Sequence, residues 1–440
     1  MPRARLVLAV LVTLATRAPA PYDLAIRHCR AVIGDGRVMA DATVFVADGR
    51  IARVEGGGGA DRVLATRSLD ARGRTLLPGL IDAHVHVTPW SIPLFLQQGV
   101  TSVRDLHNDP GYILPLARED SAERPRIVAA GALLDGPGSF WPNAVIVDDL
   151  GSAREAVRRQ VAAGAGVIKV YTRLRPAMIA EIVQEARARG VPVAAHLGRT
   201  TAAQAVMVGV ASIEHLTGIA ESAADAPDRL LAAHDDFFAG WTAAEAEWAR
   251  LDPGALDRVA RTLVEQQVVI VPTLALHEAF SRLADPALRR DPALDAVPPH
   301  VRNVEWDPAD IMRRAHWTPA TLEGFARSLP AMERFVRRYV QLGGRVAAGT
   351  DTPQQFVVPG ISLHRELELY VAGGLSPAAA LKSATIDAAT LLGIAERAGT
   401  IAAGKDADLV LVDGDPLADI RALSRIKAVL RKGRVVVAAP

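Results

Sequence analysis

Two histidines stand one residue apart at the end of an apolar segment, in the stretch LLPGLIDAHVHV that runs from Leu76 to Val87. Side chains at positions i and i+2 of a β-strand point to the same face, so a strand here would direct His84 and His86 to one side. Two imidazoles on one face can bind a zinc-like cation. A lone His-x-His pair is a weak signal, so its meaning depends on ligands from other strands.

Polar residues also stand at the ends of four further apolar segments. Lys169 lies in GVIKV, His196 closes VPVAAH, His215 closes ASIEH, and Asp351 follows RVAAGT. Each has an ordinary alternative: a histidine can satisfy a polar group of the core, a lysine can extend to solvent, and an aspartate before Thr-Pro can form a turn. Six residues in the same relative place nevertheless favour one shared site.

The elements that would position these residues form a repeating pattern between about residues 76 and 393. Eight apolar runs alternate with helical patterns, and several are rich in Val and Ile without alternation, as buried parallel strands are. The runs are GLIDAHVHV, VTSVRDLH, RIVAAGALL, GVIKVYT, VPVAAHLG, ASIEHLTG, VVIVPTLAL and GRVAAGTD. This pattern predicts a (β/α)₈ barrel, whose site would lie at the carboxyl ends of the strands. A doubly wound sheet is the main alternative, but no strand is followed by a glycine-rich phosphate loop.

Both ends of the chain are rich in short β-segments. Residues 21–75 and 394–440 contain similar hairpin signals, Asp48-Gly49-Arg50 and Lys432-Gly433-Arg434. Because each end alone has few strands, we expect the two to build one small β-sandwich.

One region of the expected barrel, about residues 217–330, is longer than connections between elements usually are. It contains the aromatic stretch DDFFAGW and a segment rich in proline and charge. Long insertions of this kind are lids and specificity elements, or surface and oligomer contacts. The sequence leaves both readings open.

Composition limits the remaining possibilities. The net charge of +1 gives no basic footprint for nucleic acid, and the single cysteine, Cys29, excludes an intrachain disulfide and a cysteine metal site. Residues 1–20 have a charged start, a short apolar stretch and the small residues Ala18-Pro19-Ala20, which predict a signal peptide and an exported protein. A start codon assigned too early would instead leave the protein in the cytoplasm. The expected partner is a small-molecule substrate, without a membrane after signal removal, and a homo-oligomer is compatible with the sequence.

Taken together, the motifs resemble the amidohydrolase superfamily of metal-dependent hydrolases. The resemblance is nearest to the branch with imidazolonepropionase-like and Xaa-Pro dipeptidase (prolidase-like) members. It extends over nearly the whole chain after the leader and rests on LLPGLIDAHVH, IKVY, AAHLG, IEHLTG, AAGTDTP and the tail SATIDAATLLGIAERAGTIAAGKDADLVLVDGDP.

This resemblance implies a site with two divalent metal ions. Lys169 would bridge them as a carbamate, N6-carboxylysine, since a plain ammonium cannot bind a cation. Zinc suits histidine and carboxylate ligands, and manganese, cobalt, nickel or iron could fill the same site. The implied ligands are His84, His86 and Asp351 for one ion, and His196 and His215 for the other.

The expected reaction is hydrolysis of a carbon–nitrogen bond by a metal-activated hydroxide. Asp351 would accept the proton of the water and pass it to the leaving group. A dipeptide or an N-acyl amino acid is the expected substrate. The alternatives are a hydrolase that opens a lactone, cyclic imide or imidazolone ring, and a catalytically inactive metal-binding scaffold protein.

Three residues are expected to contact the substrate. Tyr171 resembles the tyrosine of the prolidase-like KVY motif, and Arg173 follows it where prolidase-like relatives have a glycine-rich stretch. His277, near the end of the seventh apolar run, is the third. His107 is expected in a loop, and Glu214 is expected to face away from His215 and contact the barrel or support a metal ligand.

Overall fold

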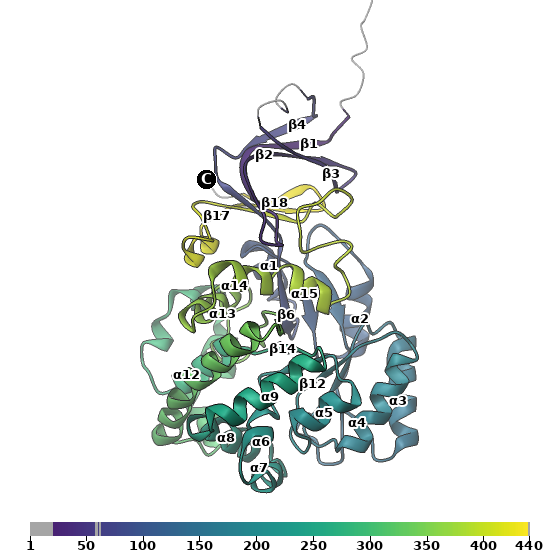
Figure 1. Ribbon diagram of the computed structural model, residues 1–440, viewed down its shortest axis with the longest axis vertical. Coiled ribbons are helices and arrows are strands. Elements are labelled where there is room, and N and C mark those ends of the chain that lie inside the picture. Colours follow the sequence, from purple (N-terminus) through teal and green to yellow (C-terminus); the bar gives the residue numbers. More distant parts are fainter. Residues whose placement is uncertain (1–20, 58–59, 61–62, 439–440) are drawn as a thin grey trace, which may run out of the picture.

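The computed structural model describes residues 21–57, 60 and 63–438, and Figure 1 shows a barrel of strands and helices below a β-sheet domain. The predicted signal peptide, residues 1–20, lies outside the described residues. Within the described part of the chain, no helix is long and apolar enough to cross a membrane.

Eight parallel strands form the barrel, as the sequence predicts. Neighbouring strands pair in chain order. The ring closes where the N–H of Ala83 donates to the carbonyl of Ala348, and the N–H of Gly166 to that of Ala129. The strands are β6 (Leu80–Val85), β7 (Val100–Asp105), β8 (Arg126–Ala129), β11 (Ile168–Val170), β12 (Val193–Ala195), β13 (Ser212–Glu214), β14 (Val269–Val271) and β15 (Arg345–Val346). Two short strands, β9 (Leu134–Asp135) and β10 (Val145–Ile146), extend the sheet beside β11.

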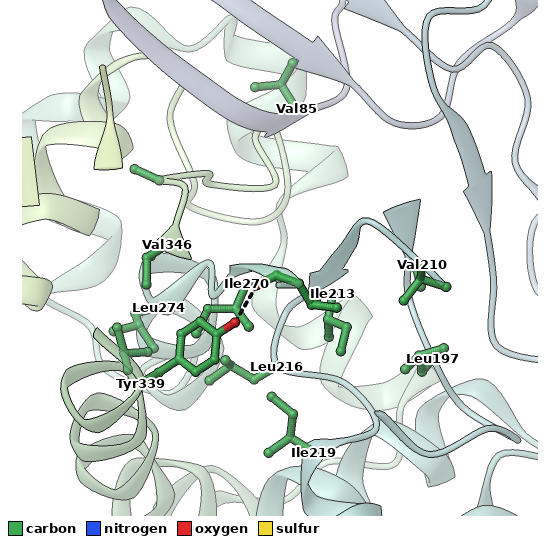
Figure 2. Close-up of a cluster of buried hydrophobic side chains, with 14 of the residues drawn as sticks. Val85, Leu197, Val210, Ile213, Leu216, Ile219, Ile270, Leu274, Tyr339 and Val346 are labelled. Atoms are coloured by element: carbon green, nitrogen blue, oxygen red, sulfur yellow. Dashed lines mark hydrogen bonds between the residues drawn. The ribbon is translucent and has the colours of Figure 1, made fainter. Parts of the chain in front are cut away.

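Amphipathic helices cover the strands. The longest is α12 (Pro319–Gln341), whose buried face includes Met332, Phe335 and Tyr339. Figure 2 shows Tyr339 beside Ile270, with its hydroxyl donating to the carbonyl of Val268 in the strand region. The other helices around the barrel are α1 (Ile92–Gln97), α2 (Pro110–Arg118), α3 (Leu150–Ala162), α4 (Pro176–Arg187), α5 (Ala202–Val208), α9 (Pro253–Glu265), α13 (Ile361–Ala372), α14 (Pro377–Ser383) and α15 (Ile386–Leu391).

The long region between β13 and α12 adds further helices. They are α6 (Ile219–Ala223), α7 (Pro227–Ala233) and α8 (Phe237–Glu247) before α9, and α10 (Leu274–Ser281) and α11 (Pro308–Arg314) after β14. Figure 1 shows α6, α7 and α8 at the end of the molecule away from the terminal sheet. The predicted insertion at 217–330 therefore also contains two regular parts of the barrel, β14 and α9.

The two ends of the chain share one eight-stranded sheet. Its order is β18-β17-β16-β5-β1-β2-β3, with β4 paired to β1, and it encloses an apolar core that includes the buried Cys29. Both predicted hairpin turns are present, with Gly49 and Gly433 at positive φ angles of 73° and 69°. The strands are β1 (Leu24–Val32), β2 (Val38–Ala47), β3 (Arg50–Gly56), β4 (Arg67–Asp70), β5 (Thr75–Pro78), β16 (Leu409–Val412), β17 (Ile426–Arg431) and β18 (Arg434–Ala438).

Candidate metal centre and substrate pocket

His84, His86 and Asp351 meet where the barrel closes between β6 and β15. His84 belongs to β6, His86 follows it, and Asp351 lies just beyond β15 with a φ angle of 63°. One carboxylate oxygen of Asp351, Oδ1, is 3.3 Å from Nε2 of His84 and 2.8 Å from Nε2 of His86. The structure thus brings His84 and His86 together with Asp351, which lies 265 positions after His86 in the chain.

The protein orients the imidazoles of His84 and His86 through Nδ1, the ring nitrogen that does not face Asp351. Nδ1 of His84 is 2.8 Å from the Glu214 carboxylate, and Nδ1 of His86 is 2.9 Å from the backbone carbonyl of His107. A carboxylate and a carbonyl accept hydrogen bonds, so each Nδ1 carries the proton and each Nε2 keeps its lone pair for a metal. Glu214 thus contacts a candidate metal ligand, and it also pairs with the buried Arg104 at 2.9 Å.

His196 and His215 complete the ring of histidines. Their ring centroids are 4.8 Å apart, and that of His215 is 4.5 Å from that of His84. Nδ1 of His215 lies 2.8 Å from the hydroxyl of Thr273. Ligand atoms of His84, His215 and Asp351 all lie within 4.8 Å of one another, so one cation can reach all three.

Lys169, on β11, is the polar group without a partner at this site. It is 2% exposed, and its Nζ has no hydrogen-bond partner among the described residues. Burial lowers the pKa of Lys169 to about 8, and burial also lowers the pKa of His84, His196 and His215 well below their usual range. Neutral imidazoles are the form that binds metals, and a neutral amine is the form that adds CO₂. The donor set therefore fits divalent metal ions, with Lys169 able to become an anionic ligand.

An aromatic pocket opens onto this cluster. It encloses about 760 Å³, including its open mouth. The ring of Tyr171 lies 4.5 Å from that of His196 and stacks on Phe237 at 6.0 Å, so Tyr171 lies in the pocket as expected. The aromatic lining consists of Phe140, Trp141, Tyr171, Phe237, Phe238, Trp241, Phe280 and Trp317.

Arg173 lies elsewhere than the sequence suggested. Its Nε donates to the carbonyl of Gly138 at 3.0 Å, and its backbone N–H donates to Asp135. It is absent from the described residues that line the pocket. The two glycines of the loop at Gly136 and Gly138 let the arginine pack closely against the backbone, which directs the guanidinium away from the metal centre.

His277 also departs from its expected place. The chain leaves β14 and turns at Thr273, whose φ angle is 51°, so His277 lies on α10 and not at a strand end. Its Nδ1 is 2.9 Å from the Glu245 carboxylate, and its ring stacks on Trp241 at 5.4 Å. Among the described residues it is absent from the lining of this pocket, but it lines a smaller cavity together with His196, His215 and Trp241.

Some lining residues had no role assigned from the sequence. Phe237, Phe238 and Trp241 come from α8, and Arg314 comes from α11. The aromatic stretch DDFFAGW inside the long region is the signal that could have drawn attention to the three aromatic residues, whereas no sequence signal pointed to Arg314. His107 also lines the pocket, and burial lowers its pKa to about 4.

The comparison with protein families agrees with this geometry. The model described as the amidohydrolase family matches residues 75–436, which span the barrel, all six candidate ligands and most of the C-terminal strands. The chain belongs to the amidohydrolase family.

Several known proteins resemble this amidohydrolase. Ochratoxinase from Aspergillus niger is 23% identical over 469 residues, which cover 90% of this chain and 82% of that protein. A crystal structure of a Xaa-Pro dipeptidase with methionine in its active site has a TM-score of 0.67 at 20% identity, and covers 94% of this chain and 99% of the other. A match to the L-hydantoinase of Paenarthrobacter aurescens is 35% identical over 66 residues and spans only 14% of that protein.

These findings confirm the family and the barrel fold predicted from the motifs, with prolidase-like proteins among the structural neighbours. This amidohydrolase is a hydrolase that acts on carbon–nitrogen bonds.

Proposed function

We propose that this amidohydrolase cleaves the amide bond of a small substrate, a dipeptide or an N-acyl amino acid, that carries a large apolar group. The observation that supports this most directly is the aromatic pocket, which opens onto His84, Lys169, His215 and Asp351. A pocket of this kind binds an apolar group by burying it and leaves the few polar groups to orient the reacting bond.

Asp351 is the residue placed to move protons. It is the only acidic side chain among the described residues that line the pocket, and it lies beside the metal-facing nitrogens of His84 and His86. When bound, divalent metal ions supply a water of lowered pKa and polarise the scissile carbonyl. Asp351 takes the proton released by that water and returns it to the leaving nitrogen, which departs as an amine.

The surrounding side chains fix the geometry of the bond. The imidazoles are held by Glu214, Thr273 and the carbonyl of His107, so their positions are set before a substrate arrives. Tyr171 lies next to His196 and is placed to contact the substrate near the reacting carbonyl. The aromatic walls reduce the contact of a bound substrate with water, which strengthens charge interactions near the buried ligands.

A cyclic substrate is the second candidate. It is favoured by the 66-residue match to an L-hydantoinase, whose name points to a cyclic substrate. Hydantoins, cyclic imides and lactones therefore belong in the same substrate panel as dipeptides and N-acyl amino acids.

Metal content and hydrolysis in a Lys169→Ala variant test the proposal. We expect about two metal ions per chain in the wild type, and in Lys169→Ala a loss of at least one ion together with about a 100-fold or greater fall in kcat/KM. Lys382→Ala is the matched control, because Lys382 is an exposed lysine that pairs with Asp387 far from the pocket. Unchanged metal content and activity in Lys169→Ala would exclude the bridging role, and a wild type that binds no metal would favour an inactive scaffold.

A further inference from the structure

Arg314 is the one cationic side chain in the pocket wall that has no role in the metal centre. Among the described lining residues, the other cationic side chain is the buried Lys169. Arg314 is the last residue of α11, and its side chain is 47% exposed. The only acidic residue in the lining, Asp351, belongs to the candidate metal site. A substrate anion that enters the pocket can therefore meet Arg314, whose Nε already pairs with Asp310 outside the lining.

The guanidinium of Arg314 is oriented and still has donors to offer. Its Nε lies 2.8 Å from the Asp310 carboxylate, one helical turn earlier, and Nη1 and Nη2 have no recorded partner among the described residues. Two terminal amino groups in one plane match the two oxygens of a carboxylate. Asp310 thus orients the guanidinium through Nε, while Nη1 and Nη2 of Arg314 remain available to a ligand.

The helix that carries Arg314 is fixed in the pocket wall. Ile311 is 5% exposed, lines the pocket and packs in an apolar cluster with Trp241, Phe280 and Trp317. The uncharged side chains of Gln354 and Gln355, which follow the Asp351 loop, belong to the same lining. The position of Arg314 is therefore set by packing and does not depend on a flexible loop.

The aromatic walls indicate the rest of the substrate. Phe140 stacks on Phe237 with ring centroids 4.5 Å apart and planes at 21°, and Phe237 stacks in turn on Tyr171 at 16°. These three near-parallel rings form a stacked row that leads to His196, and all three line the pocket, where they can contact an aromatic group of the substrate.

Building on the amide hydrolysis proposed above, we propose that Arg314 binds a carboxylate of the substrate while the aromatic wall binds a ring. The substrate class then narrows to anionic amides with an aromatic group, such as an N-acyl aromatic amino acid. This recognition replaces the role that the sequence suggested for Arg173, whose guanidinium lies against Gly138.

Binding of two ligands that cannot be hydrolysed tests Arg314 independently of catalysis. The probes are 3-phenylpropionate and 3-phenyl-1-propanol, which share a ring and differ in charge, titrated calorimetrically into the metal-loaded protein. We expect the carboxylate to bind about 10- to 100-fold more tightly than the alcohol, and Arg314→Met to remove most of that preference. Arg313→Met is the matched control, because Arg313 is 73% exposed, pairs with the same Asp310 and does not line the pocket.

Two results would overturn the assignment. A carboxylate preference that survives in Arg314→Met would come from the metal ions, and an equal loss in Arg313→Met would reflect a general charge effect.

Hydrolysis is measured separately, with N-acetyl-phenylalanine and its C-terminal amide. If the wild type cleaves the acid preferentially and Arg314→Met loses that selectivity while it still cleaves the amide, the inference is supported. Failure of the wild type to cleave any substrate of the amide panel would refute the proposed function, whereas the binding result decides the role of Arg314.

Discussion

Thr273 shows how a single residue outside the ligand set tunes the candidate metal centre. Its hydroxyl is 2.8 Å from Nδ1 of His215, which leaves Nε2 of the histidine facing the site. We expect Thr273→Val, which keeps the shape and removes the acceptor, to weaken metal binding about 10- to 100-fold. Retention of metal during dialysis against increasing chelator measures this.

Thr200→Val serves as the control for that experiment. Thr200 and Thr273 are both fully buried, and the Thr200 hydroxyl also makes a 2.8 Å hydrogen bond, but to the carbonyl of Leu174 and not to a histidine. Equal metal loss in the two variants would mean that removing any buried hydroxyl weakens metal binding by destabilising the fold. The hydrogen bond from Thr273 would then have no specific role in orienting His215.

At the scale of elements, α8 depends on a glycine for its close approach to His234, which caps the preceding helix α7. A Cβ at Gly240 would lie 2.3 Å from Nδ1 of His234, so alanine there must push α8 away and move Trp241 in the pocket wall. We expect Gly240→Ala to retain its metal and to lose about 10- to 100-fold in kcat/KM on aromatic amides, since the wall that positions the substrate shifts. Gly324→Ala, in α12 with its nearest atom 3.8 Å away, should leave both properties unchanged. Loss of metal in Gly240→Ala would instead mean that the substitution displaces the metal ligands and not only the pocket wall.

The N-terminus of α10 is held by a buried carboxyl group that titrates near neutral pH. Glu366 accepts from the N–H groups of Leu274 and Ala275 at 2.9 and 2.6 Å, and burial raises its pKa to about 7. A raised pKa in the folded state means that its stabilising contribution is fully present below about pH 4.5 and is lost as the pH rises through 7.

A Glu366→Gln variant separates this titration from the others. Because glutamine does not titrate, we expect the free energy of unfolding of the wild type to fall by about 2 to 3 kcal/mol relative to the variant between pH 5 and pH 8. Denaturant unfolding of the metal-free proteins at both pH values gives the difference. Glu323→Gln, an exposed position on α12, should show no such pH dependence. A constant difference between wild type and Glu366→Gln would show that the carboxyl group does not titrate in this range.

The sequence could predict those parts of the site that depend on strand periodicity. His84, His86 and Asp351 follow from apolar runs that end in polar residues, because parallel strands bring their carboxyl ends to one side of a barrel. Phe237 and Arg314 could not be placed, because helices inside a long insertion reach the pocket only through packing with distant elements. His277 was misplaced for a local reason, since the left-handed turn at Thr273 starts a helix inside an apolar run that resembles a continuous strand.

At the scale of the whole molecule, a buried ionic network joins the terminal sheet to the barrel. Arg431 on β17 is fully buried and pairs with Asp408 at 2.9 Å and with Asp120, which follows α2 of the barrel. Arg126 on β8 of the barrel pairs with Asp406 of the C-terminal segment. The C-terminal segment of the sheet is therefore tied to the barrel by charges, in addition to the apolar contacts of the sheet.

Breaking this network at its centre should destabilise the molecule without touching the site. Arg431→Met removes the fully buried cation between Asp120 and Asp408, although Arg126 still lies near both carboxylates. Removal of one partner of a buried ion pair costs about 3 to 5 kcal/mol. Arg434→Met, three residues along the same hairpin and exposed, should cost little. Denaturant unfolding gives the loss, while metal content per folded chain should stay that of the wild type. A fall in metal content with unchanged stability would contradict this expectation. It would mean that loss of Arg431 shifts the barrel strands that carry the ligands, so that the terminal sheet affects the geometry of the metal centre.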